Sequence, residues 1–457
     1  MSNFLFPIET TSRELDHKIL MAILAAKQKR KVIVGDQQLI RNLSYFVKNG
    51  VFYGKHLFGK PMFSDDAYYK RLKSHQFNLV HLNEEGAVWP GNEDDWKTIL
   101  EQAERPSVLD ASDFVATWGE WQEKFNINRE ETKATVKCTG HPRFDLYNSK
   151  YNEYFSNETT ALKKEFGDFI LVNTAFSYSN NGENGVKFIF KKTLSYDAKN
   201  SEHRKYRFKR WKNQMFSIAS IVELVNQLAL IYPEKNIVLR PHPSENSEYY
   251  EEIFQGIDNV HVKYEGPVTP WLLACKLLIH NGCTTAIEAT LAGKPVVNFS
   301  NGSTDDYDVY LANICGVTLS TNKQVTDFID KLKSGEYETI INDQKKAHSL
   351  FENFRSIDTA KNVLNLLEKA DEGKGESRGA AKVKIISLSL LHKLYLFSKY
   401  SYFILTGRRG NYLDYKKRFE CFDKVKIVEK VSNMSKILGY DVKVTYCSKQ
   451  VFVVERS

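Results

Sequence analysis

Apolar and polar residues alternate along the first part of the chain in a pattern that predicts repeated strand–helix units. Residues 3–8 (NFLFPI) form a short apolar run, and residues 12–29 place apolar side chains at helical spacing. A second apolar run at 31–36 (KVIVGD) completes a β-α-β unit, the seed of a parallel sheet. Four or five such repeats fill residues 1–150, which predicts a doubly wound, Rossmann-like N-terminal domain.

The same alternation continues after a polar, aromatic segment and predicts a second domain over residues 151–370. This domain opens with FILVNTAFS (169–177) and contains a long helix at 215–231, preceded by a loop-like basic stretch at 180–210. Since both domains alternate strand and helix, the predicted fold class is α/β with two Rossmann-like domains. Residues 371–457 are predicted to form a linker and a basic, apolar C-terminal extension that ends in a β-hairpin.

Two apolar runs of the second domain stop at polar residues that can hold an anion. Ligands of parallel α/β sheets bind outside the carboxyl ends of the strands. The first run ends at Arg240 and His242, whose side chains can donate charge-assisted hydrogen bonds to a phosphate. The second ends at Gly282, where the backbone can approach a ligand, and at the hydroxyls of Thr284 and Thr285. The sequence therefore predicts a nucleotide-phosphate site at this edge.

Acidic residues near these corners have two readings each. Glu265 could accept both ribose hydroxyls of a nucleotide or simply stabilise a surface turn. Glu288 could face the ligand or lie in the first turn of a helix, where an acid favours the helix dipole. The predicted nucleotide-binding residues are Arg240, His242, Pro243, Glu265, Asn281, Gly282, Thr284, Thr285, Glu288, Asn173 and Thr174.

The first domain offers carboxylates for acid–base chemistry. General acid–base catalysis needs a side chain that can take up or give a proton, and a carboxylate can do so. The predicted catalytic candidates are Glu84, Glu85, Glu9 and Asp16, with Asp36 as a further acid at a strand end. His141, Arg143 and Asp145 near the domain boundary could bind ligand, but we favour a role in pinning the interdomain linker.

Composition excludes some classes of protein. The chain has 457 residues, 42% of them hydrophobic, and a formal net charge of +8. Its six cysteines form no CxxC pair, which favours reduced thiols over a disulfide framework or a zinc site. Neither a signal peptide nor a transmembrane helix is expected. Nucleic acid is disfavoured as a partner, because the basic residues form no long stripe with interleaved aromatics outside the C-terminal segment.

Two further features leave alternatives open. The segment 382–405 is apolar and aromatic with interspersed lysines, so it could lie on an anionic membrane surface or pack on the body of the protein. No metal is expected, since the nearest approach to a clustered acid motif is Asp305-Asp306, which is more typical of a turn. Because neither a signal peptide nor a transmembrane helix is expected, we predict a cytoplasmic protein, with attachment to the inner face of the cytoplasmic membrane as an open alternative.

Several ordered motifs resemble one known family. PIETTSRELDHKILMAILAA, LNEEG, WGE, TGHPRFD, ILVNTAFS, RPHPSE and HNGCTTAIEATLAGKPVV are similar to the bacterial surface carbohydrate (surface polysaccharide) biosynthesis family over about residues 3–370. This resemblance implies a GT-B glycosyltransferase fold, in which two Rossmann-like domains face each other across a cleft and the second holds most of the donor nucleotide.

Within that larger group, the pattern resembles bacterial sialyltransferases and capsular Kdo transferases, which use CMP-activated 2-keto sugar acids. The resemblance implies that His242 and Pro243 bind the donor phosphate, that Glu265 binds the ribose, and that Thr284-Thr285 replace a pair of serines. Thr-Thr keeps the hydroxyls, whereas Asn83-Glu84-Glu85-Gly86 lacks one acid of the family's DEEG-like motif.

The resulting hypothesis is a metal-independent glycosyltransferase. It would pass a sugar from a nucleotide donor, CMP-linked by the resemblance, to a bacterial surface glycan or glycolipid, with no cofactor other than the donor as substrate. The alternatives are a UDP-sugar-dependent transferase, a UDP-GlcNAc 2-epimerase and a non-catalytic scaffold of polysaccharide assembly. The glycerophosphotransferases of teichoic acid synthesis are a more distant look-alike.

Overall fold

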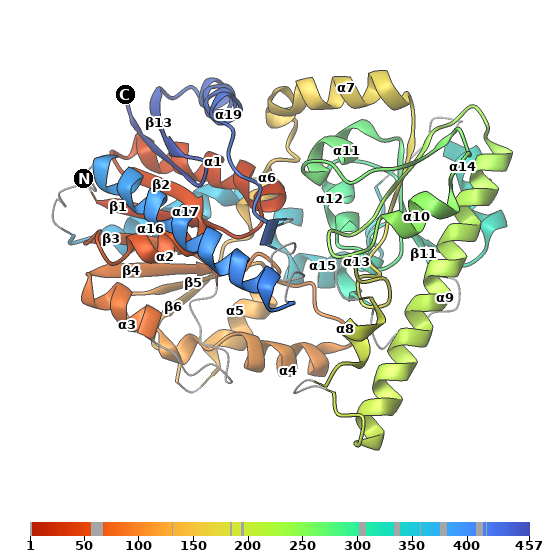
Figure 1. The fold of residues 1–457 in the computed structure, drawn as a ribbon, viewed down its shortest axis with the longest axis horizontal. Coiled ribbons are helices and arrows are strands. Elements are labelled where there is room, and N and C mark those ends of the chain that lie inside the picture. Colours follow the sequence, from red (N-terminus) through yellow and green to blue (C-terminus); the bar gives the residue numbers. More distant parts are fainter. Residues whose placement is uncertain are drawn as a thin grey trace. The chain divides into compact units, whose positions relative to one another are not determined.

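The chain folds into two compact α/β units in the computed structural model (Figure 1). The structure describes residues 2–55, 67–129, 131–182, 185–192, 196–300, 308–332, 339–356, 358–374, 382–407, 415–416 and 418–457. The first unit comprises Met1–Ala87, Glu93–Tyr154 and Lys345–Ser457, and the second comprises Val88–Asn92 and Phe155–Gln344. The Asp305-Asp306 pair lies outside the described residues.

An eight-stranded sheet forms the centre of the first unit. Its strand order is β13 (Val442–Ser448), β14 (Val451–Arg456), β2 (Lys31–Asp36), β1 (Asn3–Ile8), β3 (Gly50–Gly54), β4 (Phe77–Leu82), β5 (Phe114–Thr117) and β6 (Thr135–Cys138). Strands β1 to β6 pair in parallel. All six residues of β1 are buried, as expected for a strand covered on both faces.

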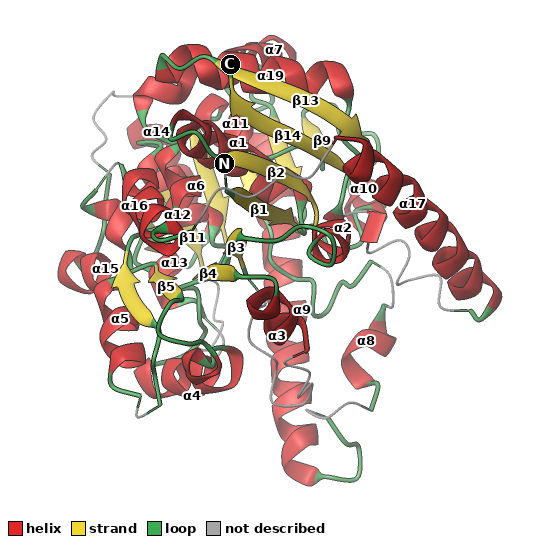
Figure 2. Ribbon diagram, turned by 90° about the vertical axis from the view of Figure 1, so that its left-hand side faces the viewer, coloured by secondary structure: helices red, strands yellow, loops and turns green. Residues whose placement is uncertain are grey.

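Helices cover the sheet of the first unit (Figure 2). They are α1 (Thr11–Lys27), α2 (Gln37–Leu43), α3 (Ala67–Ser74), α4 (Glu93–Ala103), η1 (Pro106–Val108), α5 (Glu120–Ile127), α6 (Pro142–Asp145), η2 (Ser149–Phe155), α15 (Gln344–Leu350), η4 (Glu352–Phe354), α16 (Thr359–Asp371), α17 (Lys382–Leu405) and α19 (Lys424–Leu438). The helix α1 is buried over most of its length, because it packs on the strands β2 and β14 and also on α19.

The C-terminal part of the chain corrects the predicted domain boundaries. The predicted terminal hairpin is confirmed, but β14 pairs antiparallel with β2 and so extends the first sheet (Figure 2). Val451, Phe452 and Val454 of β14 are fully buried there. The pairing covers a backbone edge that β2 would otherwise expose. Residues 345–370 belong to the first unit instead of the second, and so do the described residues beyond 370.

A six-stranded parallel sheet forms the second unit. Its order is β12 (Val317–Leu319), β11 (Val296–Phe299), β10 (Leu277–His280), β7 (Ile170–Asn173), β8 (Ile237–Arg240) and β9 (Val260–Val262). Its helices are α7 (Ser156–Phe166), α8 (Val186–Phe190), α9 (Ser201–Ile231), α10 (Glu248–Ile253), α11 (Val268–Ala274), α12 (Thr285–Leu291), α13 (Tyr310–Asn313) and α14 (Asn322–Leu332). The predicted α/β class with two Rossmann-like parallel sheets is therefore confirmed. The strand order reverses at β7, which has β8 on one side and β10 on the other, so a ligand crevice is expected there.

The long helix α9 begins earlier than the predicted 215–231. Asn200 caps it by accepting hydrogen bonds from the backbone N–H groups of Glu202 and His203, so the basic stretch from 201 is helical. Among the described residues, α9 is the helix that is long and apolar enough to cross a membrane, but 44% of its apolar window is buried. Ile221 and Leu224 belong to the core of the second unit. Such a buried helix is weak evidence for a membrane span.

Candidate functional site

The two predicted phosphate corners follow β8 and β10, the two strands that flank β7 in the second sheet. In the register of this sheet, Asn173 at the end of β7 is paired with Arg240 of β8 and with His280 of β10. The amide of Asn173 also donates to the hydroxyl of Thr285 at 2.9 Å, which joins the end of β7 to the start of α12. The structure thus brings both corners to the carboxyl edge, at the position where the strand order reverses.

His242 presents a hydrogen-bond donor at the end of β8. Its side chain belongs to an exposed residue, and its Nδ1 accepts a hydrogen bond from the backbone N–H of Ser244 at 3.2 Å. A neutral imidazole whose Nδ1 accepts must carry its proton on Nε2. The ring is therefore held in the tautomer that can donate from Nε2 to a phosphate oxygen.

A buried carboxylate, Glu245, holds the loop that carries His242. It accepts hydrogen bonds from the backbone N–H of His242 (3.2 Å) and of Phe176 (2.8 Å). It also accepts from the hydroxyls of Thr174 (2.8 Å) and Tyr250 (2.7 Å). Burial raises the pKa of Glu245, although these four donors oppose the shift. The hydroxyl of Thr174, a predicted ligand contact, is thus engaged in fixing this loop.

Arg240 fixes the neighbouring loop. Its guanidinium donates to the carbonyls of Glu265 (3.0 Å) and Gly266 (2.6 Å) and lies over the ring of Trp271. The side chain of Glu265 belongs to an exposed residue, so its carboxylate is accessible to a ligand. Arg240 therefore positions the Glu265 loop, a role that the predicted phosphate contact did not include.

The glycine corner is open on one side. Gly282 has a φ of +63°, and a Cβ at this position would meet nothing within 4 Å. The neighbouring Asn281 donates a hydrogen bond from its side-chain amide to the carbonyl of Phe299 at 2.8 Å.

The other predicted residues near this corner differ in burial. Thr284 is half-buried at the N-cap position of α12, and its side chain makes no capping hydrogen bond to the described residues. Glu288 is buried on α12, with 6% of its surface exposed. Pro243 follows His242 and is half-buried.

The burial of His280 should make the folding stability of the protein depend on pH. It is fully buried at the end of β10, and burial lowers its pKa to about 3. Below an ordinary pKa of about 6.5, the unfolded chain binds a proton that the folded chain does not, so stability falls as the pH decreases. The expected contribution is about 1.4 kcal/mol per pH unit, or about 2 kcal/mol between pH 6.5 and 5.

The test is the melting temperature of the wild type and of the His280→Asn variant across this pH range. An Asn oxygen can still accept the hydrogen bond that the N–H of Cys283 donates to Nδ1 of His280 at 3.2 Å. We expect a flatter profile for the variant than for the wild type. Two profiles of equal slope would contradict the prediction.

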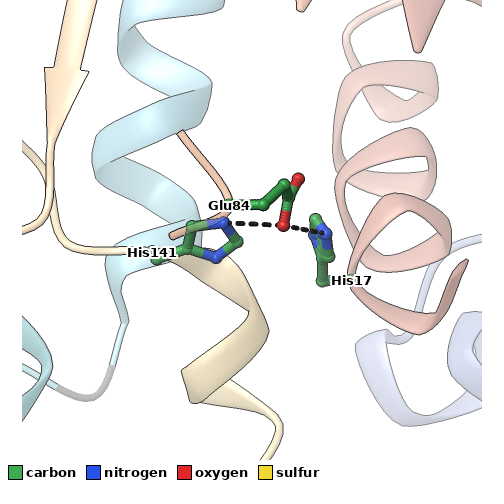
Figure 3. Close-up of side chains that lie close together, drawn as sticks. All are labelled: His17, Glu84 and His141. Carbon is green, nitrogen blue, oxygen red and sulfur yellow. Dashed lines mark ion pairs between the residues drawn. The ribbon is translucent and has the colours of Figure 1, made fainter. Parts of the chain in front are cut away.

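A second site lies in the first unit, where Glu84 is surrounded by ionisable groups (Figure 3). Its Oε2 is 3.1 Å from Nε2 of His141 and 3.4 Å from Nε2 of His17. Its Oε1 is 3.6 Å from Nζ of Lys18. All four side chains are at most 2% exposed. Residues from α1, from the loop after β4 and from the loop after β6 thus meet at the carboxyl edge of this sheet.

The pKa values of this cluster identify the charged groups. Burial lowers the pKa of His141 to about 4 and that of His17 well below its usual value, so both rings are neutral at pH 7. Burial also lowers the pKa of Lys18. Although burial raises the pKa of Glu84, its contact with His141 and the charge of Lys18 hold this pKa well below the usual range. The 3.6 Å contact between Glu84 and Lys18 fits a buried carboxylate–ammonium pair beside two neutral imidazoles.

The nitrogens of His17 and His141 and the carboxylate of Glu84 lie within 4.8 Å of one another, close enough to share a metal ion. Two contacts disfavour a cation. Nδ1 of His141 accepts from the backbone N–H of Arg143 at 3.1 Å, so the neutral ring carries its proton on Nε2, the atom that faces Glu84. In addition, the ammonium of Lys18 already neutralises the carboxylate. The donor set fits a shared proton better than a metal, and the predicted absence of a metal stays a prediction.

A small pocket that is partly open to solvent adjoins this cluster. The space between its lining residues is about 190 Å³, with open solvent counted in. Lys55 forms ion pairs there with Glu9 (2.7 Å) and Glu14 (3.0 Å). The pocket is lined by Pro7, Glu9, Glu14, Lys18, Gln37, Gly54, Lys55 and Glu84.

The four predicted catalytic acids have different surroundings. Glu84 is buried in the cluster, whereas Glu9 is 23% exposed and also pairs with Arg418 at 2.9 Å. Glu85 is 64% exposed and pairs with Arg13 at 2.6 Å. Asp16 points elsewhere, because it accepts hydrogen bonds from the hydroxyl of Tyr154 (2.7 Å) and from Lys430 of α19 (3.0 Å).

The three residues near the predicted domain boundary make different contacts. His141 belongs to the Glu84 cluster, and Arg143 donates to the carbonyl of Glu84 at 3.4 Å. Asp145 accepts from the hydroxyl of Thr359 and from the backbone N–H of Ala360, both at 2.7 Å, and so caps α16. Asp145 thus holds α16 within the first unit, and His141 and Arg143 lie against Glu84, so the role in pinning the interdomain linker stays a prediction.

Sequence reasoning missed Glu245, His17, Lys18 and Lys55. Glu245 stands three residues after His242 in RPHPSE, so its place beside a candidate site was an available signal. His17 and Lys18 belong to a predicted helix whose buried face includes Ile19 and Leu20. Their helical spacing gave no sign that ionisable side chains are buried together with apolar ones.

Comparison with known proteins identifies similar solved structures but no family. No family model matches the chain, and no curated protein matches its sequence. One similar structure is a UDP-GlcNAc 2-epimerase from Methanocaldococcus jannaschii in complex with UDP-GlcNAc and UDP, with 10% identity, a TM-score of 0.49, and coverage of 80% of this chain and 99% of that chain.

Two further similar structures are transferase and polymerase enzymes by description. A glycosyltransferase from Rickettsia africae ESF-5 has 12% identity and a TM-score of 0.43, and covers 81% of this chain and 99% of that one. The wall teichoic acid polymerase TagF has 10% identity and a TM-score of 0.46, with coverage of 81% and 88%. Similarity at these levels assigns no activity to this chain.

Proposed function

We propose that this chain is a glycosyltransferase that passes a sugar from a CMP-activated donor to a bacterial surface glycan or glycolipid. The donor sugar would be a Kdo- or nonulosonate-type 2-keto sugar acid, as the motif resemblance implies. We place the reaction in the cytoplasm, at the inner face of the cytoplasmic membrane.

The observation that carries the proposal is the carboxyl edge of the second sheet. An Nε2–H donor on His242, an accessible carboxylate on Glu265 and an open glycine turn at Gly282 lie at the ends of strands on both sides of β7. The phosphate of a nucleoside monophosphate can accept hydrogen bonds from His242 and from the glycine turn, and its ribose diol can donate to the carboxylate of Glu265. This combination favours a nucleotide as the ligand of the second unit.

In the proposed reaction, the bond between the anomeric carbon and the phosphate oxygen breaks, and its electron pair stays on CMP. Nε2–H of His242 stabilises the charge that develops on the leaving phosphate. The acceptor oxygen bonds to the anomeric carbon, and its proton passes to a carboxylate of the first unit. We assign this role to Glu9, which lines the pocket and is partly exposed, whereas Glu84 is buried.

A thermal-shift panel of CMP, CDP, UDP and GDP, with and without Mg²⁺, tests the proposal. A ligand that binds only the folded chain stabilises it by about 2.7 kcal/mol at a hundredfold excess over its Kd, and so raises the melting temperature. We expect a selective shift with CMP that does not require Mg²⁺, followed by transfer from CMP-Kdo to a glycan acceptor.

Other outcomes separate the alternatives. A shift with UDP alone would replace the CMP proposal by a UDP-sugar transferase or 2-epimerase, and turnover of UDP-GlcNAc without an acceptor would then identify the epimerase. The absence of a shift with any of the four nucleotides would contradict a nucleotide-dependent enzyme and favour the scaffold.

A further inference from the structure

The helix α17 carries an apolar face that the rest of its unit leaves open. Among its large apolar residues, Val383 and Phe397 are each 73% exposed, Leu394 is 64% exposed and Leu405 is 85% exposed. Residues 383, 390, 394, 397 and 404 follow one another at helical spacing, and the side chains at 390 and 404 are also more than half exposed. The exposed apolar surface therefore runs along the length of the helix.

The opposite side of α17 fixes its orientation. Ile385, Ser389, His392 and Leu396 lie at spacings typical of one helix face, and each is at most 8% exposed. Nε2 of His392 lies 3.1 Å from Oδ1 of Asp36 at the end of β2. The hydroxyls of Ser389 and of Ser448 in β13 are 2.9 Å apart. The helix packs on α2 and β13 through this side, and Figure 2 shows it leaving the edge of the sheet.

The charge of α17 has one sign. Its 24 residues include four lysines and no aspartate or glutamate. Lys384 and Lys393 are exposed, and Lys399 lies 5.6 Å from the ring centre of Tyr395. On a helical projection, Lys384 and Lys393 fall on the two flanks of the apolar face, and Tyr395 and Tyr402 lie beside Lys384. Apolar side chains between lysines and tyrosines are the features of a helix that lies in a membrane interface.

We propose that the outer face of α17 binds the surface of an anionic lipid bilayer. The apolar side chains enter the boundary between headgroups and acyl chains, while the lysines contact anionic headgroups. Because the buried side is anchored to Asp36 and β13, the helix lies along the membrane and does not cross it. This surface extends the proposed function by adding a partner, and it requires no nucleotide.

Co-sedimentation of the full chain with vesicles tests this inference. We expect binding to vesicles made of equal parts phosphatidylcholine and phosphatidylglycerol, and much weaker binding to phosphatidylcholine alone. The Leu394→Ser/Phe397→Ser double variant should bind the anionic vesicles about a hundredfold more weakly, because two large apolar side chains no longer enter the bilayer. Lys384→Glu/Lys393→Glu should weaken the same binding and reduce its sensitivity to salt.

The matched control is Ile127→Ser, which removes an apolar side chain that is 52% exposed elsewhere on the same unit. It should leave vesicle binding unchanged, and all variants should keep the wild-type melting temperature. Equal sedimentation of the wild type and the Leu394→Ser/Phe397→Ser variant would overturn the inference. A second result would also overturn it: self-association of the wild type without vesicles, dependent on protein concentration and abolished in the Leu394→Ser/Phe397→Ser variant. The apolar face would then bind a second copy of the chain. Nucleotide-induced thermal shifts are read separately, so this inference and the proposed function can fail independently.

Discussion

Glu84→Gln is expected to lower the free energy of unfolding by about 3–5 kcal/mol, because it leaves the buried ammonium of Lys18 without a counter-charge. Lys18 is 1% exposed, and its Nζ lies 3.6 Å from Oε1 of Glu84. The ring of Tyr53 lies 3.9 Å from the same Nζ, which stabilises the ammonium only in part. Chemical denaturation of the purified variant measures the loss.

A double-mutant cycle separates the ion pair from packing. Lys18→Met keeps most of the volume of the side chain and removes its charge. We expect the Glu84→Gln/Lys18→Met double variant to recover stability relative to the sum of the single variants, with a coupling of about 1–3 kcal/mol. The control Glu101→Gln replaces an exposed acid of the same unit and should change stability by less than about 0.5 kcal/mol. Additive single effects would show that Glu84 and Lys18 are not coupled.

His242→Ala should weaken nucleotide binding by about 10- to 100-fold while the protein remains folded. A hydrogen bond to a charged group contributes about 1.5–3 kcal/mol, and Nε2–H of His242 is the donor that we assign to the phosphate. The side chain belongs to an exposed residue, so the melting temperature should change little. Isothermal titration with CMP measures the affinity.

Two variants make this result specific. His242→Gln keeps an N–H donor and should retain part of the affinity, whereas His348→Ala on α15 of the first unit should bind CMP like the wild type. Normal affinity in His242→Ala with an unchanged melting temperature would remove His242 from the nucleotide site. A large loss of melting temperature would instead assign the residue to the stability of the RPHPSE loop.

The sequence alone determined the local parts of this protein. Apolar runs such as 31–36 and 277–279 became the strands β2 and β10 almost as predicted, because continuous apolar segments are buried in parallel sheets. Polar residues after the runs at 237–239 and 277–279 predicted the edge that contains His242 and Gly282, since all carboxyl ends of a parallel sheet lie on one side. The terminal hairpin was also predicted, because alternation and a tight turn are local signals.

Only the tertiary structure decided which distant residues meet. His17, Glu84 and His141 come from separate segments, and their burial together follows from the order of the strands, which no local pattern contains. The same holds for Glu245. Its PSE sequence is typical of a surface loop, but the fold buries its carboxylate under the His242 loop. The pairing of β14 with β2 joins residues more than 400 positions apart. Local propensity fixes the elements of the chain, whereas burial of apolar surface and satisfaction of backbone hydrogen bonds select their partners.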